Sequence, residues 1–304
     1  MPTTEHKADA ETVPMSVTHG EKTEILIEAL PYIQQYEGAT FVVKYGGAAM
    51  TDEALCETFA QDVTLLTKIG IRIVIVHGGG REITDTADRL GLQTRFVGGH
   101  RYTDEQMMDV VQMVLSGKTN KDIVRRINAH GGGAVGISGI DADLLRVRRL
   151  RPDGVDLGFV GEVVSVNTDF LHLLADHGSM PVVAPVGVDE NGIVHNVNAD
   201  TAAAAVAAFL RAEKLVYLSD VPGVLADGSL VHSLTRASAA GMIASGAISN
   251  GMLPKIRSAF SALDAGVTKV HMIDGRVTHS ILLEIFTREG LGTEIVHDPG
   301  ESAA

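Results

Sequence analysis

The sequence predicts an α/β fold in which parallel strands alternate with helices. A unit of strand, glycines and helix occurs twice within the first 90 residues. The first unit is an apolar strand at residues 41–43, then Gly46-Gly47, then a helix start at residues 51–53. The second is a strand at residues 72–77 that ends in three glycines and leads into another helix. Connections that contain a whole helix imply neighbouring strands that run parallel, with right-handed crossovers.

A helix is expected ahead of the first strand. Residues 1–20 are polar and without periodicity, which predicts a disordered tail. Between residues 21 and 37, Ile25, Leu26 and Ile33 fall on one helical face, and Pro31 should interrupt and kink the helix. Such an apolar face must be buried. It packs either on its own domain or on another subunit, and the sequence leaves both open.

The rest of the chain continues the α/β pattern, with one exception. A capping-box pattern at residues 103–106 opens a long helix that should extend to about residue 129, before a strand at 134–138. Short alternating segments at residues 144–166, broken by glycines, predict a β-hairpin excursion. Later helices are expected near residues 169–177, 201–210, 234–245, 255–265 and 279–286, and strands near 181–186, 214–218, 269–273 and 293–296.

The length of the chain, 304 residues, suits one large α/β unit or two lobes. The turn-rich segment 187–198 is the expected boundary between lobes. The predicted organisation is therefore a tail (1–20), an N-terminal helix (21–37), an N-terminal lobe (38–187) and a C-terminal lobe (188–304).

Composition and charge exclude several classes of protein. The formal net charge of −13 argues against nucleic acid as a partner, because binding to a phosphate backbone needs a basic field. No apolar run approaches the roughly 20 residues of a membrane helix, and the N-terminus lacks the pattern of a secretory signal. A single cysteine, Cys56, rules out an internal disulfide and a cysteine-rich metal site. These features favour a cytoplasmic protein.

The two glycine segments after the strands are candidate anion sites. Paired glycines let backbone N–H groups approach an anion, and Lys44 at the end of the first strand adds a full charge. Gly78-Gly79-Gly80 leaves N–H groups free at the start of a helix. In both cases a plain strand-to-helix turn is the alternative.

Three further segments carry polar groups beyond what a turn requires. Arg101 precedes a capped helix and is suited to a bidentate grip on a carboxylate, although a surface salt bridge is equally compatible. Asn196, Asn198 and Asp200 alternate, so in an extended segment they would share one face; the alternative is a helix N-cap. Lys255 lies at a helix start, where the macrodipole disfavours a cation, which indicates a nearby anion.

Two other patterns are discarded. Residues 131–136 fit Gly-x-Gly-x-x-Gly but follow a helix and precede a strand, the reverse of a dinucleotide site. Residues 116–119 resemble the end of a P-loop, but the leading glycine would fall at Gln112, inside a helix. His77 is left unassigned, and no side chain is assigned as a metal ligand.

Together these motifs resemble the amino acid kinase family, and within it the acetylglutamate kinases. The segments KYGGAAM, VHGGG, NVNAD, LSDVPGVL and GMLPK occur in that family's order and span nearly the whole chain from about residue 21. Each is weak alone, but the combination is specific. The resemblance implies a three-layer αβα sandwich around a mainly parallel open sheet, with an N-terminal lobe for N-acetyl-L-glutamate and a C-terminal lobe for ATP.

The resemblance also implies a role for each candidate residue. Lys44 and Lys255 match two lysines that stabilise the transition state, and Asp200 matches the aspartate that holds them. The residues that match the acetylglutamate site are Gly79, Gly80, Arg101, Asn196 and Asn198. The residues that match the nucleotide site are Gly46, Gly47, Ser219, Asp220 and Gly223.

The chemistry of such a kinase agrees with the residues present. The acceptor is a γ-carboxylate, which is ionised at neutral pH and needs no general base. The obstacle is bringing two anions together, so ATP, Mg²⁺, the two lysines and glycine N–H groups should act by positioning and charge neutralisation.

A second resemblance is to the arginine-inhibited branch of these kinases. It rests on the N-terminal helix and on residues 275–284 and 290–293. It implies that N-terminal helices interlace dimers into a hexamer, a trimer of dimers, and that L-arginine binds beside that helix. His279, Glu284 and Gly290 would belong to the arginine site, although a helix-start histidine and a solvated glutamate are the plainer interpretations.

Several alternatives stay open at this stage. Aspartate, glutamate, carbamate or UMP could be the acceptor, and a non-catalytic arginine sensor or the kinase-like domain of an acetylglutamate synthase is a different class. The presence of Lys44, Lys255 and Asp200 together argues against a dead site. One departure, Ile140 where many relatives carry lysine, leaves the role of that position open.

Overall fold

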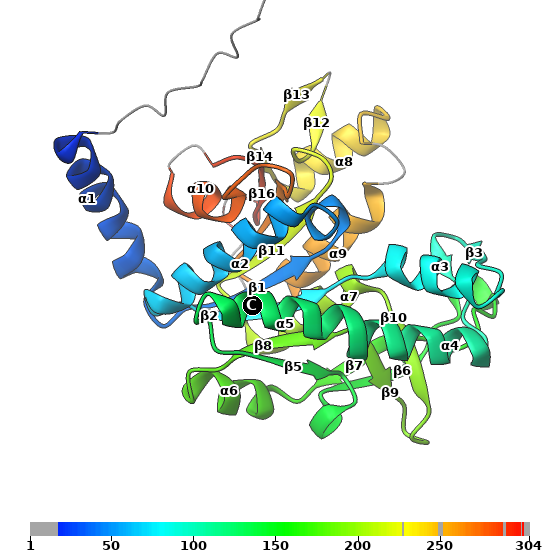
Figure 1. Cartoon of the computed structure of the whole chain (residues 1–304). Helices are drawn as coiled ribbons and strands as arrows, with labels where there is room; N and C mark the ends of the chain where they lie inside the picture. Colours follow the sequence, from blue (N-terminus) through cyan, green and yellow to red (C-terminus); the bar gives the residue numbers. More distant parts are fainter. Residues whose placement is uncertain (1–17, 227, 249–251, 288–289, 299, 301–304) are drawn as a thin grey trace, which may run out of the picture.

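An eight-stranded sheet forms the centre of the molecule (Figure 1). The structure, a computed structural model, describes residues 18–226, 228–248, 252–287, 290–298 and 300. In spatial order the strands are β14 (Ser233–Leu234), β16 (Thr293–Ile295), β15 (Lys269–Asp274), β11 (Lys214–Ser219), β1 (Thr40–Tyr45), β2 (Arg72–His77), β8 (Met180–Ala184) and β5 (Ala134–Ser138). Neighbouring strands run parallel except β15 and β16. The predicted open and mainly parallel sheet is confirmed.

Helices cover both faces of this sheet and make the fold a three-layer sandwich. One face carries α6 (Thr168–Asp176), α7 (Ala199–Leu210) and α9 (Leu253–Asp264). The other face carries α2 (Glu53–Lys68), α5 (Asn120–Ala129) and α10 (Ser280–Phe286). The sandwich that the sequence led us to expect is therefore present.

Strand β1 shows why the sheet is buried on both sides. Val42 packs in the core below α7, whereas Phe41 and Val43 pack in the core below α2. Successive side chains of a strand alternate between faces, so a strand buried on both faces is a continuous apolar run. The same alternation takes Lys44 toward α7 and Tyr45 toward α2, where Tyr45 stacks on Phe59 with ring centroids 3.7 Å apart.

The predicted hairpin excursion is confirmed and belongs to a larger unit. β6 (Leu145–Arg149) and β7 (Val160–Val166) pair antiparallel. Together with β9 (Val186–Val188) and β10 (Val194–Val197) they form a closed four-stranded barrel, which was not predicted. The expected strand 181–186 is split by Pro185 into β8, in the central sheet, and β9, in the barrel.

The long helix expected at residues 103–129 is divided by a π-helical stretch. It consists of α4 (Glu105–Gln112), the π-helix Met113–Thr119 and α5. The capping prediction holds in part: Asp104, not Thr103, is the N-cap, and its side chain accepts a hydrogen bond from the N–H of Met107.

The N-terminal helix α1 (His19–Tyr36) leads into β1 and projects from the body of the protein (Figure 1). Pro31 lies inside this helix and does not end it, contrary to the predicted interruption. The predicted tail lies outside the described residues up to residue 17, and α1 already includes residues 19 and 20. Leu26, Ile27 and Leu30 are 72%, 63% and 44% exposed, so the described residues leave these apolar side chains of α1 largely uncovered.

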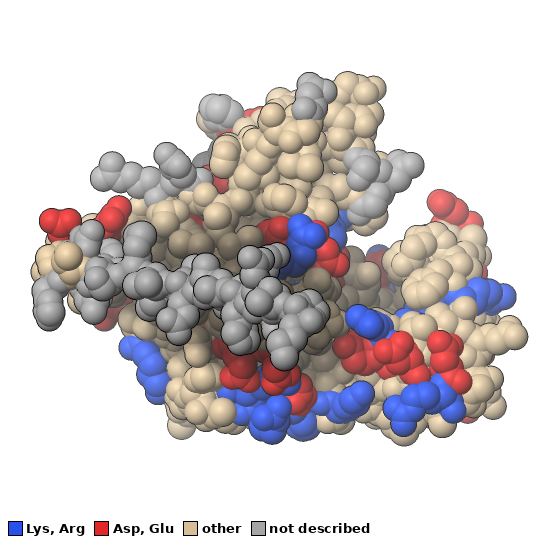
Figure 2. All heavy atoms as spheres, turned by 45° about the horizontal axis from the view of Figure 1, so that its top comes forward, with Lys and Arg blue, Asp and Glu red and all other residues tan. Residues whose placement is uncertain are grey.

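Short elements complete the described chain. The remaining helices are α3 (Gly80–Arg89), α8 (Arg236–Ala244) and the 3₁₀ turns Gly47–Met50, Asp141–Asp143 and Pro152–Gly154. Two small hairpins are β3 (Phe96–Val97) with β4 (His100–Arg101), and β12 (Leu225–Ala226) with β13 (Ser229–Leu230). No helix in the described ranges is long and apolar enough to cross a membrane. Figure 2 shows acidic and basic side chains intermixed along the lower edge of that view.

We expect Gly187→Ala to destabilise the barrel. A Cβ at Gly187 in β9 would overlap Val147 and lie 2.9 Å from the carbonyl oxygen of Leu145, so the backbone of β6 or β9 would have to shift. The free energy of unfolding, measured by urea denaturation, should fall by about 2–3 kcal/mol.

The matched control is Gly117→Ala in the π-helical stretch, where a Cβ meets nothing within 4 Å. It should leave stability unchanged or raise it by up to about 1 kcal/mol. An equal loss in both variants would contradict the packing argument.

Candidate active site

The candidate site lies at the carboxyl ends of β11, β1 and β2, which are adjacent in the sheet. Lys44 is opposite Tyr217 on one side and Val76 on the other, so the three strands end at nearly the same level. The loops that follow therefore meet at one edge, where ligands bind in open α/β sheets. The predicted glycine segments are brought together in this way.

Asp200 lies between the two candidate lysines. Its two carboxylate oxygens are 3.0 Å from Lys44 Nζ and 3.0 Å from Lys255 Nζ. The side chains are 20%, 11% and 23% exposed respectively, so the cluster is largely shielded from water but still reached from outside. Burial by itself would raise the pKa of Asp200, but the two ammonium groups outweigh it and hold this pKa below its usual value.

The backbone around Asp200 is fixed by capping and by a buried tyrosine. Asn198 is the N-cap of α7, and its Oδ1 accepts hydrogen bonds from the N–H groups of Asp200 and Thr201. The carbonyl of Asp200 accepts a hydrogen bond from Tyr217 Oη, 3.2 Å away. The extended segment predicted for residues 196–200 therefore ends at Asn198, and the N-cap alternative was right for that residue.

The glycines after β1 are required by close approaches. A Cβ on Gly46 would lie 2.7 Å from Lys44 Nζ. Gly47 has φ +70°, and a Cβ there would also overlap the carboxylate of Asp220. Asp220 Oδ1 accepts a hydrogen bond from the N–H of Ala48 at 2.6 Å, so the loop after β11 is joined to the loop after β1.

A cavity of about 470 Å³ opens above these loops. The predicted residues that line it are Lys44, Gly46, Gly47, Gly79, Gly80, Arg101, Asn196, Asn198 and Asp200. Lys255 reaches the same place through Asp200. Residues predicted from four separate segments of the sequence thus face one space.

Arg101 is held in the wall of this cavity without an ionic partner. It is only 8% exposed, and its guanidinium donates hydrogen bonds to the carbonyl of Gly80 at 2.7 Å and to Thr84 Oγ1 at 2.9 Å. No carboxylate in the described part of the chain lies within ion-pair distance of it. Burial lowers its pKa, but an arginine remains charged, so this buried cation is available for an anionic ligand. The surface salt bridge considered for Arg101 is not present.

The other predicted nucleotide residues lie nearby with different roles. Asp220 lines a neighbouring hollow of about 440 Å³ together with Gly47, Gly79 and Gly80. The carbonyl of Ser219 accepts a hydrogen bond from the N–H of Gly275. Gly223 packs on β16, where a Cβ would lie 2.5 Å from Thr293 Oγ1.

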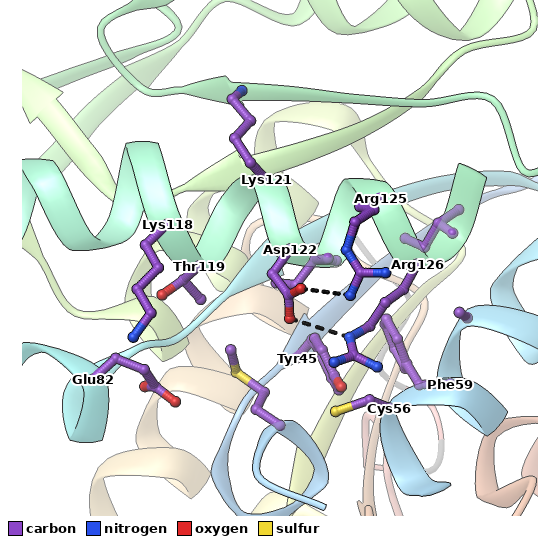
Figure 3. A pocket seen from close by; sticks show the side chains of 14 residues that line it. Tyr45, Cys56, Phe59, Glu82, Lys118, Thr119, Lys121, Asp122, Arg125 and Arg126 are labelled. Atoms are coloured by element: carbon purple, nitrogen blue, oxygen red, sulfur yellow. Dashed lines mark hydrogen bonds and ion pairs between the residues drawn. The ribbon is translucent and has the colours of Figure 1, made fainter. Parts of the chain in front are cut away.

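A second cavity, of about 510 Å³, lies between α2 and α5 (Figure 3). Asp122 is paired there with Arg125 and Arg126 (Figure 3). Arg126 is also paired with Glu53 and Glu57, which do not line the cavity. No glycine is among the residues that line it, so it lacks the open backbone N–H groups of the first cavity. The first cavity is therefore the better candidate for anion chemistry.

Glu284 and Gly290, predicted for an effector site, meet in a buried polar cluster. Glu284 Oε1 is 2.6 Å from His271 Nδ1, and Oε2 accepts hydrogen bonds from the N–H groups of Leu291 and Gly292. Burial would raise the pKa of Glu284, but His271 and these N–H groups hold it below its usual value. A Cβ on Gly290 would lie 2.8 Å from Oε2, so glycine is needed beside the carboxylate.

Two members of this cluster were not predicted. Lys214 Nζ is 2.9 Å from His271 Nε2 and 5.1 Å from the ring centroid of Tyr36, the last residue of α1. Burial lowers the pKa of Lys214 to about 8. The sequence did offer a signal, because Lys214 and His271 lie in strands whose neighbouring residues are mostly apolar, β11 and β15.

His279 has a different partner from Glu284. It is the N-cap residue of α10 with φ +56°, and its Nδ1 lies 2.5 Å from Oδ1 of the buried Asp62 in α2. The structure thus joins the start of α10 to α2 through this pair.

Comparison with known proteins identifies the family of this chain. The family model for the amino acid kinase family matches residues 39–274. An acetylglutamate kinase of Chlorobium chlorochromatii is 55% identical over 279 residues, which are 92% of this chain and 97% of that protein. A second, from Aquifex aeolicus, is 52% identical over 90% of this chain and 97% of its own.

Among solved structures, the N-acetylglutamate synthase of Neisseria gonorrhoeae, in complex with coenzyme A and N-acetyl-glutamate, superposes with a TM-score of 0.82 and 29% identity. The match covers 91% of this chain and 63% of that chain. The fold, the order of motifs and the relatives agree: the chain belongs to the amino acid kinase family and groups with its acetylglutamate kinases.

Proposed function

We propose that this chain transfers the γ-phosphoryl group of ATP to the γ-carboxylate of N-acetyl-L-glutamate, a step of arginine biosynthesis. The product is N-acetyl-L-glutamyl 5-phosphate. The observation that carries the proposal is the cluster of Lys44, Asp200 and Lys255 at a glycine-lined cavity, in a chain 55% identical to an acetylglutamate kinase. The name of that relative supports the acceptor.

The cluster suits a reaction between two anions. A γ-carboxylate is already ionised at neutral pH, so the site needs no general base to activate it. Lys44 and Lys255 together carry two positive charges and Asp200 carries one negative charge. One net positive charge therefore remains to stabilise the phosphoryl group during its transfer. Groups that face developing charge without reorganising lower the barrier most effectively.

The acceptor is placed by groups in the wall of the cavity. Arg101, buried and without an ionic partner, binds a carboxylate of acetylglutamate through its charge and its remaining N–H groups. Asn196 and Asn198 supply amide groups for its polar atoms, and the N–H groups of Gly79 and Gly80 contact the reacting anion.

The nucleotide lies on the side of the C-terminal elements. Gly46 and Gly47 leave room for the phosphates beside Lys44, and the segment from Ser219 through Asp220 to Gly223 forms the adjoining loop. The described residues contain no cluster of three or more His, Cys, Asp or Glu that could hold a metal ion. Mg²⁺ would therefore enter with ATP, held mainly by phosphate oxygens and water.

We expect ADP release with Mg-ATP and N-acetyl-L-glutamate, and none above background with glutamate, aspartate, carbamate or UMP. The acetyl group and the two carboxylates of the true acceptor are needed to satisfy Arg101 and the asparagines. A coupled assay for ADP checks this with each acceptor at equal concentration.

Turnover only with another acceptor would leave the kinase site in place and contradict the assigned acceptor. Failure with every acceptor, in protein that still binds ATP, would favour a non-catalytic sensor.

We expect Lys44→Met and Lys255→Met each to lower kcat by about 10²–10³-fold, because each removes a charge that acts on the transferred group. The matched control is Lys68→Met, an exposed lysine in the last turn of α2, which should keep kcat. Thermal unfolding of all three variants separates loss of chemistry from loss of fold. A loss of less than fivefold in both site variants would rule out the assigned role.

We also propose that L-arginine inhibits this enzyme at the cluster of Glu284, Gly290, His271 and Lys214. The buried Glu284 contacts His271, which contacts Lys214, and Lys214 in turn lies over the ring of Tyr36 at the end of α1. The proposed effector site is therefore connected to the N-terminal helix by a chain of contacts. The exposed apolar face of α1 supports the proposal that this helix packs on the same helix of another subunit and builds a hexamer. In such a hexamer, the contacts between α1 helices would join neighbouring dimers.

We expect Glu284→Gln to raise the arginine concentration for half-inhibition at least tenfold, because it removes the anion that pairs with the guanidinium. His279→Gln tests the other charged member predicted for this site; it should weaken inhibition less than Glu284→Gln, because His279 pairs with Asp62 and not with Glu284. Deleting residues 1–37 should abolish both the hexamer, seen by light scattering, and inhibition. A truncated protein that arginine still inhibits would refute the role of the helix.

A further inference from the structure

The loop of three glycines after β2 depends on the orientation of one peptide group. The carbonyl of Gly78 accepts a hydrogen bond from His77 Nδ1 at 2.7 Å. In a trans peptide the C=O and the following N–H point in opposite directions, so the N–H of Gly79 points away from His77. In the described part of the chain this N–H has no acceptor, and Gly79 lines the cavity. Glycine allows this peptide to turn easily, so something must hold it.

The proton on His77 can be assigned from its partners alone. A carbonyl oxygen only accepts, so Nδ1 carries the hydrogen and Nε2 is an acceptor. Nε2 lies 3.2 Å from Asn120 Nδ2. That atom is the amide nitrogen, because it also faces the carbonyl oxygens of Val182 at 2.8 Å and Ile137 at 3.3 Å. A protonated imidazole would place one N–H against another, and burial in any case lowers the pKa of His77 to about 4.

Asn120 connects three strand ends to the loop. It is 1% exposed and contacts His77 of β2, Val182 of β8 and Ile137 of β5. Its Oδ1 accepts a hydrogen bond from Lys121 Nζ at 3.1 Å, so both ends of the amide are satisfied. A Cβ on Gly136 in β5 would overlap this amide, so the neighbouring strand leaves room for it.

The π-helical stretch places Asn120. Buried positions along the helix follow steps of three or four, as from Val111 to Val114 and from Ile123 to Ile127. Across the π-helical stretch the buried pair Val114–Leu115 is followed by the buried pair Thr119–Asn120, five residues later, which is the spacing of a π-turn. The extra residue rotates the following part of the helix and turns Asn120 toward the sheet. Such turns are frequent at functional sites.

We propose that Asn120 and His77 are positioning residues that hold the Gly78–Gly79 peptide with its N–H directed into the reaction cavity. Asn120 fixes the tautomer of His77, and His77 fixes the carbonyl of Gly78. The proposal rests on the proposed function in one respect: the anion that the N–H of Gly79 meets is the reacting phosphoryl or carboxylate group. Neither positioning residue touches substrate.

Two variants at position 77 separate this role from packing. His77→Asn places an amide N–H where Nδ1 was and keeps the bond to Gly78, whereas His77→Gln places polar atoms only where Nε2 was. Both remove part of a fully buried ring, and the shorter asparagine leaves the larger void, so packing alone predicts at least as large a loss in His77→Asn. We expect kcat to fall tenfold or more in His77→Gln and no more than about threefold in His77→Asn. KM for N-acetyl-L-glutamate should change by less than about twofold in both, because the N–H acts on the transition state.

Thermal unfolding of both variants is the control for folding. A loss of kcat in His77→Asn at least as large as that in His77→Gln would overturn the proposal, since packing alone predicts it. If the wild-type protein does not phosphorylate acetylglutamate, the proposed function fails, and a measurement without substrate then decides the positioning role.

That measurement is ¹⁵N NMR of the histidine side chains in the wild-type chain, with the His77 signal identified by its absence in His77→Asn. We expect a neutral ring protonated at Nδ1 at pH 7. In Asn120→Leu, of similar size but without hydrogen bonds, the ring should populate both tautomers. A wild-type ring protonated at Nε2, or doubly protonated, would contradict the assignment.

Discussion

The position of Asp200 between Lys44 and Lys255 is the constraint on which the site depends. The three residues come from β1, α7 and α9, which are far apart in the sequence, so the ion pairs exist only when all three elements are in place. A carboxylate in the first turn of α7 is favoured by the helix dipole, and a lysine in the first turn of α9 is not. The ion pair with Asp200 therefore offsets the unfavourable interaction between Lys255 and the dipole of α9. The two lysines together still leave a net positive charge at the cavity.

Local charge, not net charge, makes the proposed anion site compatible with so acidic a chain. The formal net charge is −13, yet Arg101 and the two lysines converge on one cavity. Arg101 is the more informative cation. A buried charge is costly unless it is paired, and neutral oxygens of Gly80 and Thr84 compensate only part of that cost. A bound carboxylate would supply the missing negative charge, so a ligand would form the ion pair that Arg101 lacks in the folded chain.

Most of the sheet and most of the cavity could be predicted from the sequence, because both follow from local signals. Apolar runs such as residues 41–43, followed by glycines, mark strand ends, and parallel strands must end at one edge. What could not be predicted depends on distant partners. The barrel closes only because β9 and β10 pair with β6 and β7. A role for His271 can be recognised only from its contacts with Glu284 and Lys214. The π-turn adds one residue to the spacing between buried positions of the helix. A prediction that assumes the α-helical period of about 3.6 residues does not detect this single extra residue.

Strand β11 gives the proposed regulation a physical route. Lys214, in the proposed effector cluster, begins this strand, and Ser219, beside the proposed nucleotide site, ends it. Five residue steps in a strand span about 17 Å, and the strand is buried along its whole length between β1 and β15. A ligand that displaces Lys214 therefore acts on a rigid element whose other end adjoins Asp220 and, through Ala48, the loop that follows Lys44. The long β11–β15 pair, joined again where Gly275 donates to Ser219, is the element that both proposed sites have in common.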